Sequence, residues 1–141
     1  MTRFLIDTSA FWRLLRSRRL HHLWRPVVLE GDVRSCYPQR AEFLRSARDI
    51  SEYEQYAEMF AELYDDIAVP KSAGQWIAGL QHQAAQHGVH RALSAVDLQL
   101  CATAAHHGLT VLHDDNDFVT AASLATELNE RNIHAGPAAS S

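Results

Sequence analysis

The chain alternates between short apolar runs and longer stretches in which apolar and polar residues recur at helical spacing. The short runs predict buried strands over residues 4–6, 33–37, 67–70 and 109–112, with a further short strand starting at Asn129. The longer stretches predict helices over residues 10–20, 38–48, 51–66, 72–87, 92–105 and 118–128. Such alternation is typical of an α/β fold, in which helices flank a mostly parallel central sheet in three layers.

Turn signals separate these elements and bound the domain. His21 and His22 are expected in a turn before Trp24-Arg25-Pro26. With no internal repeat or linker, the sequence predicts a single domain over residues 1–135. The Ala- and Ser-rich residues 136–141 are expected to form a disordered tail.

The composition excludes several classes of protein. A chain of 141 residues that is 47% hydrophobic and 21% charged is typical of a soluble globular domain. No apolar run approaches the roughly 18 residues that span a membrane, and the start of the chain lacks the hydrophobic region of a signal peptide. Cys36 and Cys101 stand alone in apolar contexts, which indicates reduced core residues. We therefore expect a cytoplasmic protein without membrane contact.

The net charge of −4 hides a strong asymmetry along the chain. Residues 1–48 contain ten arginines and four acidic residues, whereas residues 49–141 contain three basic and thirteen acidic residues. The predicted helix over residues 10–20 gathers several of these arginines on one side. This surface is either a binding face for phosphate or a partner, or an ordinary solvated helix side.

The candidate chemistry lies in acidic residues that stand within apolar sequence. Asp7 ends the first strand, Glu42 lies one turn into a helix, and Asp97 is the only charge between residues 92 and 105. Three more acids, Asp114, Asp115 and Asp117, follow the strand over residues 109–112. Because parallel strands end at one edge of the sheet, these positions are expected to converge there.

Each acid also has an ordinary structural explanation. Asp7 is a suitable N-cap, and Glu42 is favourable near a helix N-terminus. Asp97 can form a salt bridge, for which Arg91 is the nearest basic residue in the sequence. Residues 114–117 can form a solvated turn.

Converging carboxylates repel one another unless a cation neutralises them. Oxygen ligands without His or Cys suit Mg²⁺ or Mn²⁺, and such sites serve phosphoryl transfer. A zinc site is excluded, because His82, His87 and His90 do not have the spacing of zinc ligands.

The acidic motifs resemble those of PIN-domain ribonucleases, and in particular of the VapC toxins of bacterial toxin–antitoxin pairs. The resemblance covers about residues 3–135. It rests on Ile6-Asp7-Thr8-Ser9, on Gln39-Arg40-Ala41-Glu42-Phe43-Leu44, on Ala95-Val96-Asp97-Leu98-Gln99-Leu100-Cys101-Ala102-Thr103-Ala104 and on Leu112-His113-Asp114-Asp115-Asn116-Asp117-Phe118.

The resemblance implies a Mg²⁺-dependent endoribonuclease, with Mn²⁺ as a possible substitute. Such an enzyme cleaves tRNA, rRNA or mRNA with a metal-activated water and inhibits translation. A cognate VapB-type antitoxin neutralises it, and the toxin is expected to form a homodimer.

Carried to this sequence, the resemblance assigns catalytic roles to Asp7, Glu42, Asp97, Asp115 and Asp117. Of these, Asp7, Asp97 and Asp115 are the implied metal ligands, with Thr8 or Ser9 tethering Asp7. The run of three acids contains one more than the family pattern needs. Which of Asp114, Asp115 and Asp117 is the direct ligand therefore stays open. Pro38 also shortens the strand that normally precedes the Glu helix.

Two other functions compete with the nuclease. The aromatic residues Trp12, Trp24 and Phe60, interspersed with charges, are consistent with a non-catalytic PIN-like module that binds a protein. An aspartyl-phosphate enzyme is disfavoured, because Asp7 lacks the second Asp two residues later that such loops usually carry.

Overall fold

Four short parallel strands form the centre of the fold. The computed structural model describes residues 2–137. The strands are β1 (Phe4–Ile6), β2 (Val33–Arg34), β3 (Thr110–His113) and β4 (Asn129–Asn132). They lie in the order β2-β1-β3-β4, and every neighbouring pair is parallel. The expected parallel sheet is therefore confirmed, and all its strands end at the same edge.

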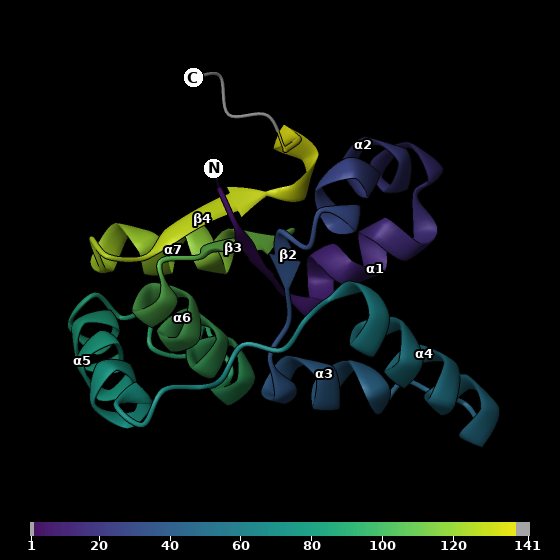
Figure 1. The fold of residues 1–141 in the computed structure, drawn as a ribbon. Helices are drawn as coiled ribbons and strands as arrows, with labels where there is room; N and C mark the ends of the chain where they lie inside the picture. The colour runs from purple at the N-terminus through teal and green to yellow at the C-terminus, as the bar shows by residue number, and fades with distance from the viewer. Residues whose placement is uncertain (1, 138–141) are drawn as a thin grey trace.

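Seven α-helices within residues 2–137 connect the strands and cover the sheet (Figure 1). They are α1 (Thr8–Arg16), α2 (Arg18–Leu29), α3 (Tyr37–Leu44), α4 (Ile50–Leu63), α5 (Ala73–Gln86), α6 (Ala95–His107) and α7 (Asn116–Leu124). A short 3-10 helix, η1 (Ile133–Ala135), follows β4.

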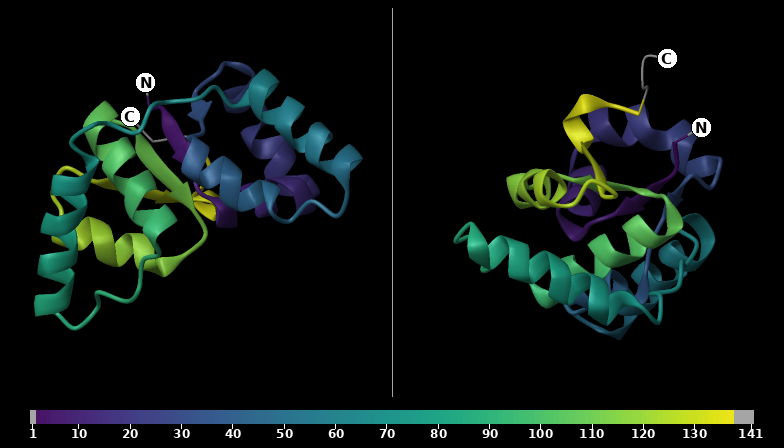
Figure 2. Two further views of the ribbon diagram at one scale, coloured as in Figure 1. Left: turned by 90° about the horizontal axis from the view of Figure 1, so that it is seen from below. Right: turned by 90° about the vertical axis from the view of Figure 1, so that its left-hand side faces the viewer.

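The helices lie on both faces of the sheet and give the three layers that the sequence predicts. Phe4 and Ile6 of β1 pack in a core with residues of α1–α4. Leu5 points to the opposite face, into a second core formed with α5–α7. Figure 2 shows these two groups of helices on either side of the strands in its left-hand view. The uninterrupted apolar run of β1 fits a strand that is buried on both faces.

The first long helix that the sequence predicts is in fact two helices. Ser17 has an extended backbone, with φ −106° and ψ 112°, and ends α1. Its hydroxyl accepts a hydrogen bond from the Leu20 N–H at 3.2 Å and so caps the start of α2. A serine cap in the middle of the predicted helix therefore changes the direction of the chain, and α1 and α2 pack against each other.

The turn predicted at His21 and His22 is wrong, because α2 continues through both residues and through Pro26. Trp24 lies on the same helix and is fully buried. Its indole N–H donates to the Ile133 carbonyl at 3.0 Å. This tertiary anchoring stabilises the helix across a residue that locally disfavours it.

The strand predicted over residues 67–70 is not formed. The chain there makes one isolated parallel bridge, between Ser35 and Asp66. The neighbouring strand β2 is short because α3 already begins at Tyr37. Beyond Ser35, the chain that follows β2 turns into α3 and offers residues 67–70 no extended partner.

Residues 2–137 contain no helix with the length and apolar character needed to cross a membrane. The carbonyl of Gly136 accepts a hydrogen bond from Arg131. The domain end at residue 135 and the disordered tail remain predictions, since residues 138–141 lie outside the described part of the chain.

Candidate active site

Asp7 follows β1 directly and is buried, with 4% of its surface exposed. It is the N-cap of α1, and its carboxylate accepts from the Ser9 N–H at 3.0 Å and from the Ser9 hydroxyl. Burial raises the pKa of Asp7 to about 6, although the Ser9 hydrogen bonds act to lower it. The carboxylates of Asp97 and Glu42 raise the pKa further. One side chain therefore both caps a helix and belongs to a group of mutually repelling carboxylates.

Glu42 reaches the same edge of the sheet from α3. Its Oε1 accepts a hydrogen bond from the Thr8 hydroxyl at 2.8 Å. The two hydroxyls that follow Asp7 thus hold different carboxylates, since Ser9 binds Asp7 and Thr8 binds Glu42. Glu42 is the sixth of the eight residues of α3, so a favourable position at a helix N-terminus does not explain it, and its observed partner is Thr8.

Asp97 lies in the first turn of α6 and forms a capping box with Ser94. The Asp97 N–H donates to Ser94 Oγ at 3.1 Å, and the Ser94 N–H donates to the Asp97 carboxylate at 3.2 Å. In the described part of the chain, Asp97 makes no ion pair with Arg91. Burial raises the pKa of Asp97 against the lowering effect of Ser94, and the carboxylates of Glu42 and Asp115 add to the rise.

The three acids after β3 have different surroundings. Asp114 pairs with Arg13 of α1 at 2.6 Å and lies 3.4 Å from His134. Partial burial acts to raise the pKa of Asp114, but these two partners outweigh it and lower the pKa. Asp115 is the N-cap of α7 and accepts from the Asp117 N–H at 2.9 Å. Burial and the neighbouring Asp115 raise the pKa of Asp117.

Mutual charge effects connect five side chains, which we call the acidic cluster: Asp7, Glu42, Asp97, Asp115 and Asp117. Asp7 follows β1, Glu42 lies in the second half of α3, Asp97 lies in the first turn of α6, and Asp115 and Asp117 lie at the start of α7. Asp114 stands apart, because Arg13 neutralises it. The sequence indicates three crowded carboxylates at residues 114–117. In the structure, Arg13 of α1 relieves part of this repulsion by pairing with Asp114.

The donor chemistry of the acidic cluster fits a hard divalent cation, since every donor is a carboxylate oxygen. Within residues 2–137, however, no three His, Cys, Asp or Glu side chains are grouped closely enough to hold a metal ion. Instead, Asp7, Glu42 and Asp97 each accept from a hydroxyl or N–H of a nearby residue. Binding one ion between them therefore requires side-chain rotation.

Two residues beside the acidic cluster are not evident from the sequence. Arg13 stands out only as one of several arginines on an amphipathic helix, and no local pattern pairs it with Asp114. His113 is fully buried and contacts both Glu130 and the backbone of Asp115. Its position, directly after an apolar run, is the one local signal for its burial.

Comparisons with known proteins show the family to which the chain belongs. Residues 4–124 match the PIN domain family. Ribonuclease VapC6 of Mycobacterium tuberculosis is 48% identical over 101 residues, which are 72% of this chain and 80% of VapC6. Ribonuclease VapC2 of the same species is 32% identical over 139 residues, 97% of each chain. VapBC2 from Rickettsia felis, solved bound to promoter DNA, is 10% identical and shares the fold, with a TM-score of 0.74 over 92% of this chain and 97% of that one. The chain therefore belongs to the PIN-domain family and, within it, to the VapC proteins.

Proposed function

We propose that this protein is a metal-dependent endoribonuclease and the toxin of a toxin–antitoxin pair. The acidic cluster carries the proposal, because five carboxylates from four separate elements share one edge of the sheet. The names of the relatives support it, since VapC6 and VapC2 are ribonucleases. A similar structure from Mycobacterium tuberculosis, VapBC-5, is described as a toxin–antitoxin system. A VapB-type antitoxin is accordingly the partner we propose.

Asp7, Asp97 and Asp115 are the proposed metal ligands, and Glu42 and Asp117 are the proposed supporting catalytic residues. When bound, Mg²⁺ or Mn²⁺ supplies the positive charge that activates water and stabilises the leaving oxygen of a phosphodiester. The Ser9 N–H donates to the Asp7 carboxylate at 3.0 Å and holds it at the start of α1. Thr8 holds Glu42 beside it, where Glu42 can orient the attacking water.

The exposed arginines of α1 and α2 support RNA as the substrate. No acidic residue lies between Thr8 and Leu29. The exposed basic residues of this surface are Arg13, Arg16, Arg18, Arg19, His21, His22 and Arg25. Through its contact with Asp114, Arg13 brings this surface next to the acidic cluster. A polyanion that must approach a group of carboxylates needs such a positive surface beside it.

The direct test is incubation of the purified protein with total RNA in Mg²⁺, in Mn²⁺ and in EDTA. We expect discrete fragments with either metal and none with EDTA, because the carboxylates alone supply no positive charge to the transition state. Addition of the cognate antitoxin should suppress the fragments, and the uninhibited protein should block cell-free translation. Cleavage that persists in EDTA would contradict metal dependence.

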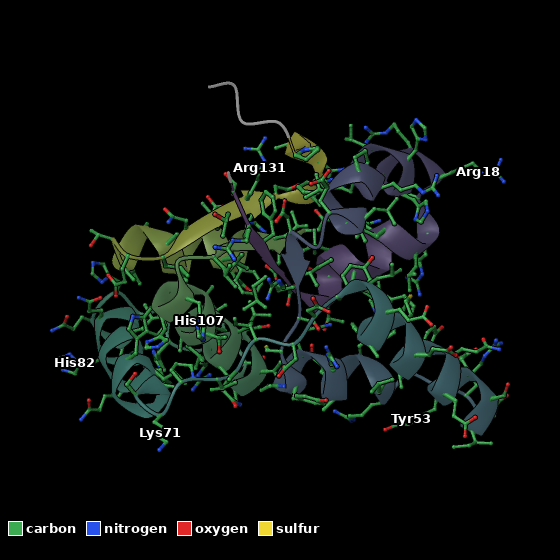
Figure 3. All side chains as sticks on the ribbon, viewed as in Figure 1. Arg18, Tyr53, Lys71, His82, His107 and Arg131 are labelled. Atoms are coloured by element: carbon green, nitrogen blue, oxygen red, sulfur yellow. The ribbon has the colours of Figure 1, made fainter. Side chains whose placement is uncertain are left out.

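Removal of a single arginine charge should weaken RNA binding in a salt-dependent way. Log affinity falls as log salt concentration rises, and we expect Arg18→Gln to make this fall less steep by about 1, the contribution of one phosphate contact. Lys71→Gln is the matched control, since Figure 3 shows Lys71 beside α5, far from Arg18 on α2. Binding of a labelled single-stranded RNA in EDTA measures both slopes. Equal slopes for the two variants would contradict an RNA face on α2.

A non-catalytic interaction module remains the second candidate. One observation favours it: within residues 2–137 no three candidate ligands are grouped for a metal. This candidate predicts no cleavage and no binding of Mn²⁺ at millimolar concentration. For either function we expect a homodimer, which light scattering of the purified protein tests.

A further inference from the structure

His113 links β4 to the backbone of Asp115 through the two nitrogens of its ring. It is the last residue of β3, and none of its surface is exposed. The Asp115 N–H donates to His113 Nδ1 at 3.1 Å. His113 Nε2 lies 2.7 Å from Oε1 of Glu130, on the neighbouring strand β4.

The donor in the first contact fixes the arrangement of protons in the second. Because a backbone N–H can only donate, Nδ1 must present its lone pair to Asp115. The ring proton of the neutral histidine therefore lies on Nε2, where it donates to Glu130. Glu130 thus favours the tautomer that is able to hold Asp115.

The ring itself has little freedom to move. It packs against Phe118 of α7, with ring centroids 5.3 Å apart. On the other side of Asp115, the carboxylate accepts from the Asp117 N–H at 2.9 Å. The backbone of Asp115 is therefore held by His113, while its side chain is held by the first turn of α7.

We propose that His113, supported by Glu130, is a positioning residue for Asp115. By fixing the Asp115 backbone, it fixes the direction from which the Asp115 carboxylate meets the acidic cluster. The inference rests on the proposed function, in which Asp115 is a metal ligand. Partners that orient a ligand without touching the metal typically contribute 10–100-fold to metal affinity or activity.

A pair of substitutions at His113 separates positioning from packing. His113→Asn keeps an acceptor near the place of Nδ1, because Asn readily accepts from the N–H two residues on. His113→Gln instead carries its amide at the distance of Nε2, so it keeps a donor to Glu130 and loses the acceptor for Asp115. Both variants lose the ring and its contact with Phe118, so a difference between them reports the lost hydrogen bond.

The measured quantity is the Mn²⁺ concentration that gives half-maximal RNA cleavage, with thermal melting as the check on folding. We expect His113→Gln to raise this concentration about 10-fold and His113→Asn to change it less than about threefold. Equal values for the two folded variants would overturn the proposal. If neither variant folds, Glu130→Gln, which keeps an acceptor for Nε2–H, is compared with Glu130→Leu, which does not. Only the Leu variant should need more Mn²⁺, and equal needs would again overturn the proposal.

Failure of the proposed function gives a different result from failure of this inference. If the wild-type protein cleaves no RNA with either metal, calorimetric binding of Mn²⁺ replaces cleavage as the readout. Binding weakened in His113→Gln and retained in His113→Asn supports the positioning role without the nuclease. Unchanged binding in both variants, or no binding by the wild type, overturns it.

Discussion

Asp115→Asn is expected to reduce RNA cleavage at least about 100-fold, whereas Asp114→Asn, one residue away, should stay within about threefold of the wild type. The two substitutions are chemically identical and differ only in surroundings. Asp115 belongs to the acidic cluster through its effect on Asp97 and Asp117. Asp114 is already paired with Arg13 at 2.6 Å, so a metal ion would have to compete with the guanidinium group for this carboxylate. Initial rates on one RNA, at saturating Mg²⁺, compare the two variants.

The design also controls for stability. Asparagine caps a helix as well as aspartate does, so the bond from the Asp117 N–H to residue 115 should survive the change. Asp97→Asn should lose activity like Asp115→Asn, because it removes a second proposed metal ligand. The variant should still fold, since its amide oxygen can accept from the Ser94 N–H and preserve the cap. Equal loss in the Asp114 and Asp115 variants, or full activity of a folded Asp115→Asn protein, would refute the assignment of the ligand.

Asp7→Asn is expected to stabilise the metal-free protein while it abolishes cleavage. Burial and neighbouring carboxylates raise the pKa of Asp7 from 3.8 to about 6 in the folded protein. The folded state therefore binds this proton more tightly than the unfolded chain does. The free energy of unfolding should therefore fall as the pH rises from about 4 to about 6, by about 3 kcal/mol for this group. Above about pH 6 the whole of this destabilisation by the charged carboxylate is present.

The comparison is made by urea unfolding in EDTA at pH 7 and at pH 4. Asp7→Asn should be more stable than the wild type at pH 7, since the amide still accepts from the Ser9 N–H without a buried charge. The difference should vanish at pH 4, where the wild-type carboxyl is protonated. Mn²⁺ at pH 7 should stabilise only the wild type.

A second N-cap aspartate provides the matched control. Asp49 caps α4 by accepting from the Glu52 N–H at 2.8 Å, and it is exposed. Asp49→Asn should therefore give no gain at either pH. The same gain in the free energy of unfolding for Asp49→Asn, or a gain for Asp7→Asn that does not depend on pH, would contradict this explanation. Either result would show that burial of the Asp7 charge is not what destabilises the wild type.

Much of the fold was predictable because its signals are local. The apolar run over residues 4–6 predicts a buried strand, and the structure confirms it and shows both faces of that strand in the core. The order of strands and helices predicts a parallel sheet, which requires that Asp7 and the acids after β3 share one edge. Isolated acids in apolar sequence therefore indicate the candidate site.

Local signals failed where a distant residue decided the outcome. Pro26 and the two histidines before it indicate a turn, but the buried Trp24 anchors a continuous helix there. Residues 67–70 have the composition of a strand, but the short β2 offers no ladder for them to extend. In both cases the tertiary environment outweighed the intrinsic preference of the segment.

The sequence by itself determined the layers of the fold and the sheet edge at which Asp7 and the acids after β3 lie, because periodicity and strand direction fix both. Only the tertiary structure shows that, of the acids after β3, Asp114 is paired with Arg13. Arg13 and Asp114 are 101 positions apart, and His113 and Glu130 lie on different strands. Such pairings depend on how α1 and β4 pack beside β3, and the energy of a charge or a hydrogen bond depends on that packing. No pattern along the chain records it.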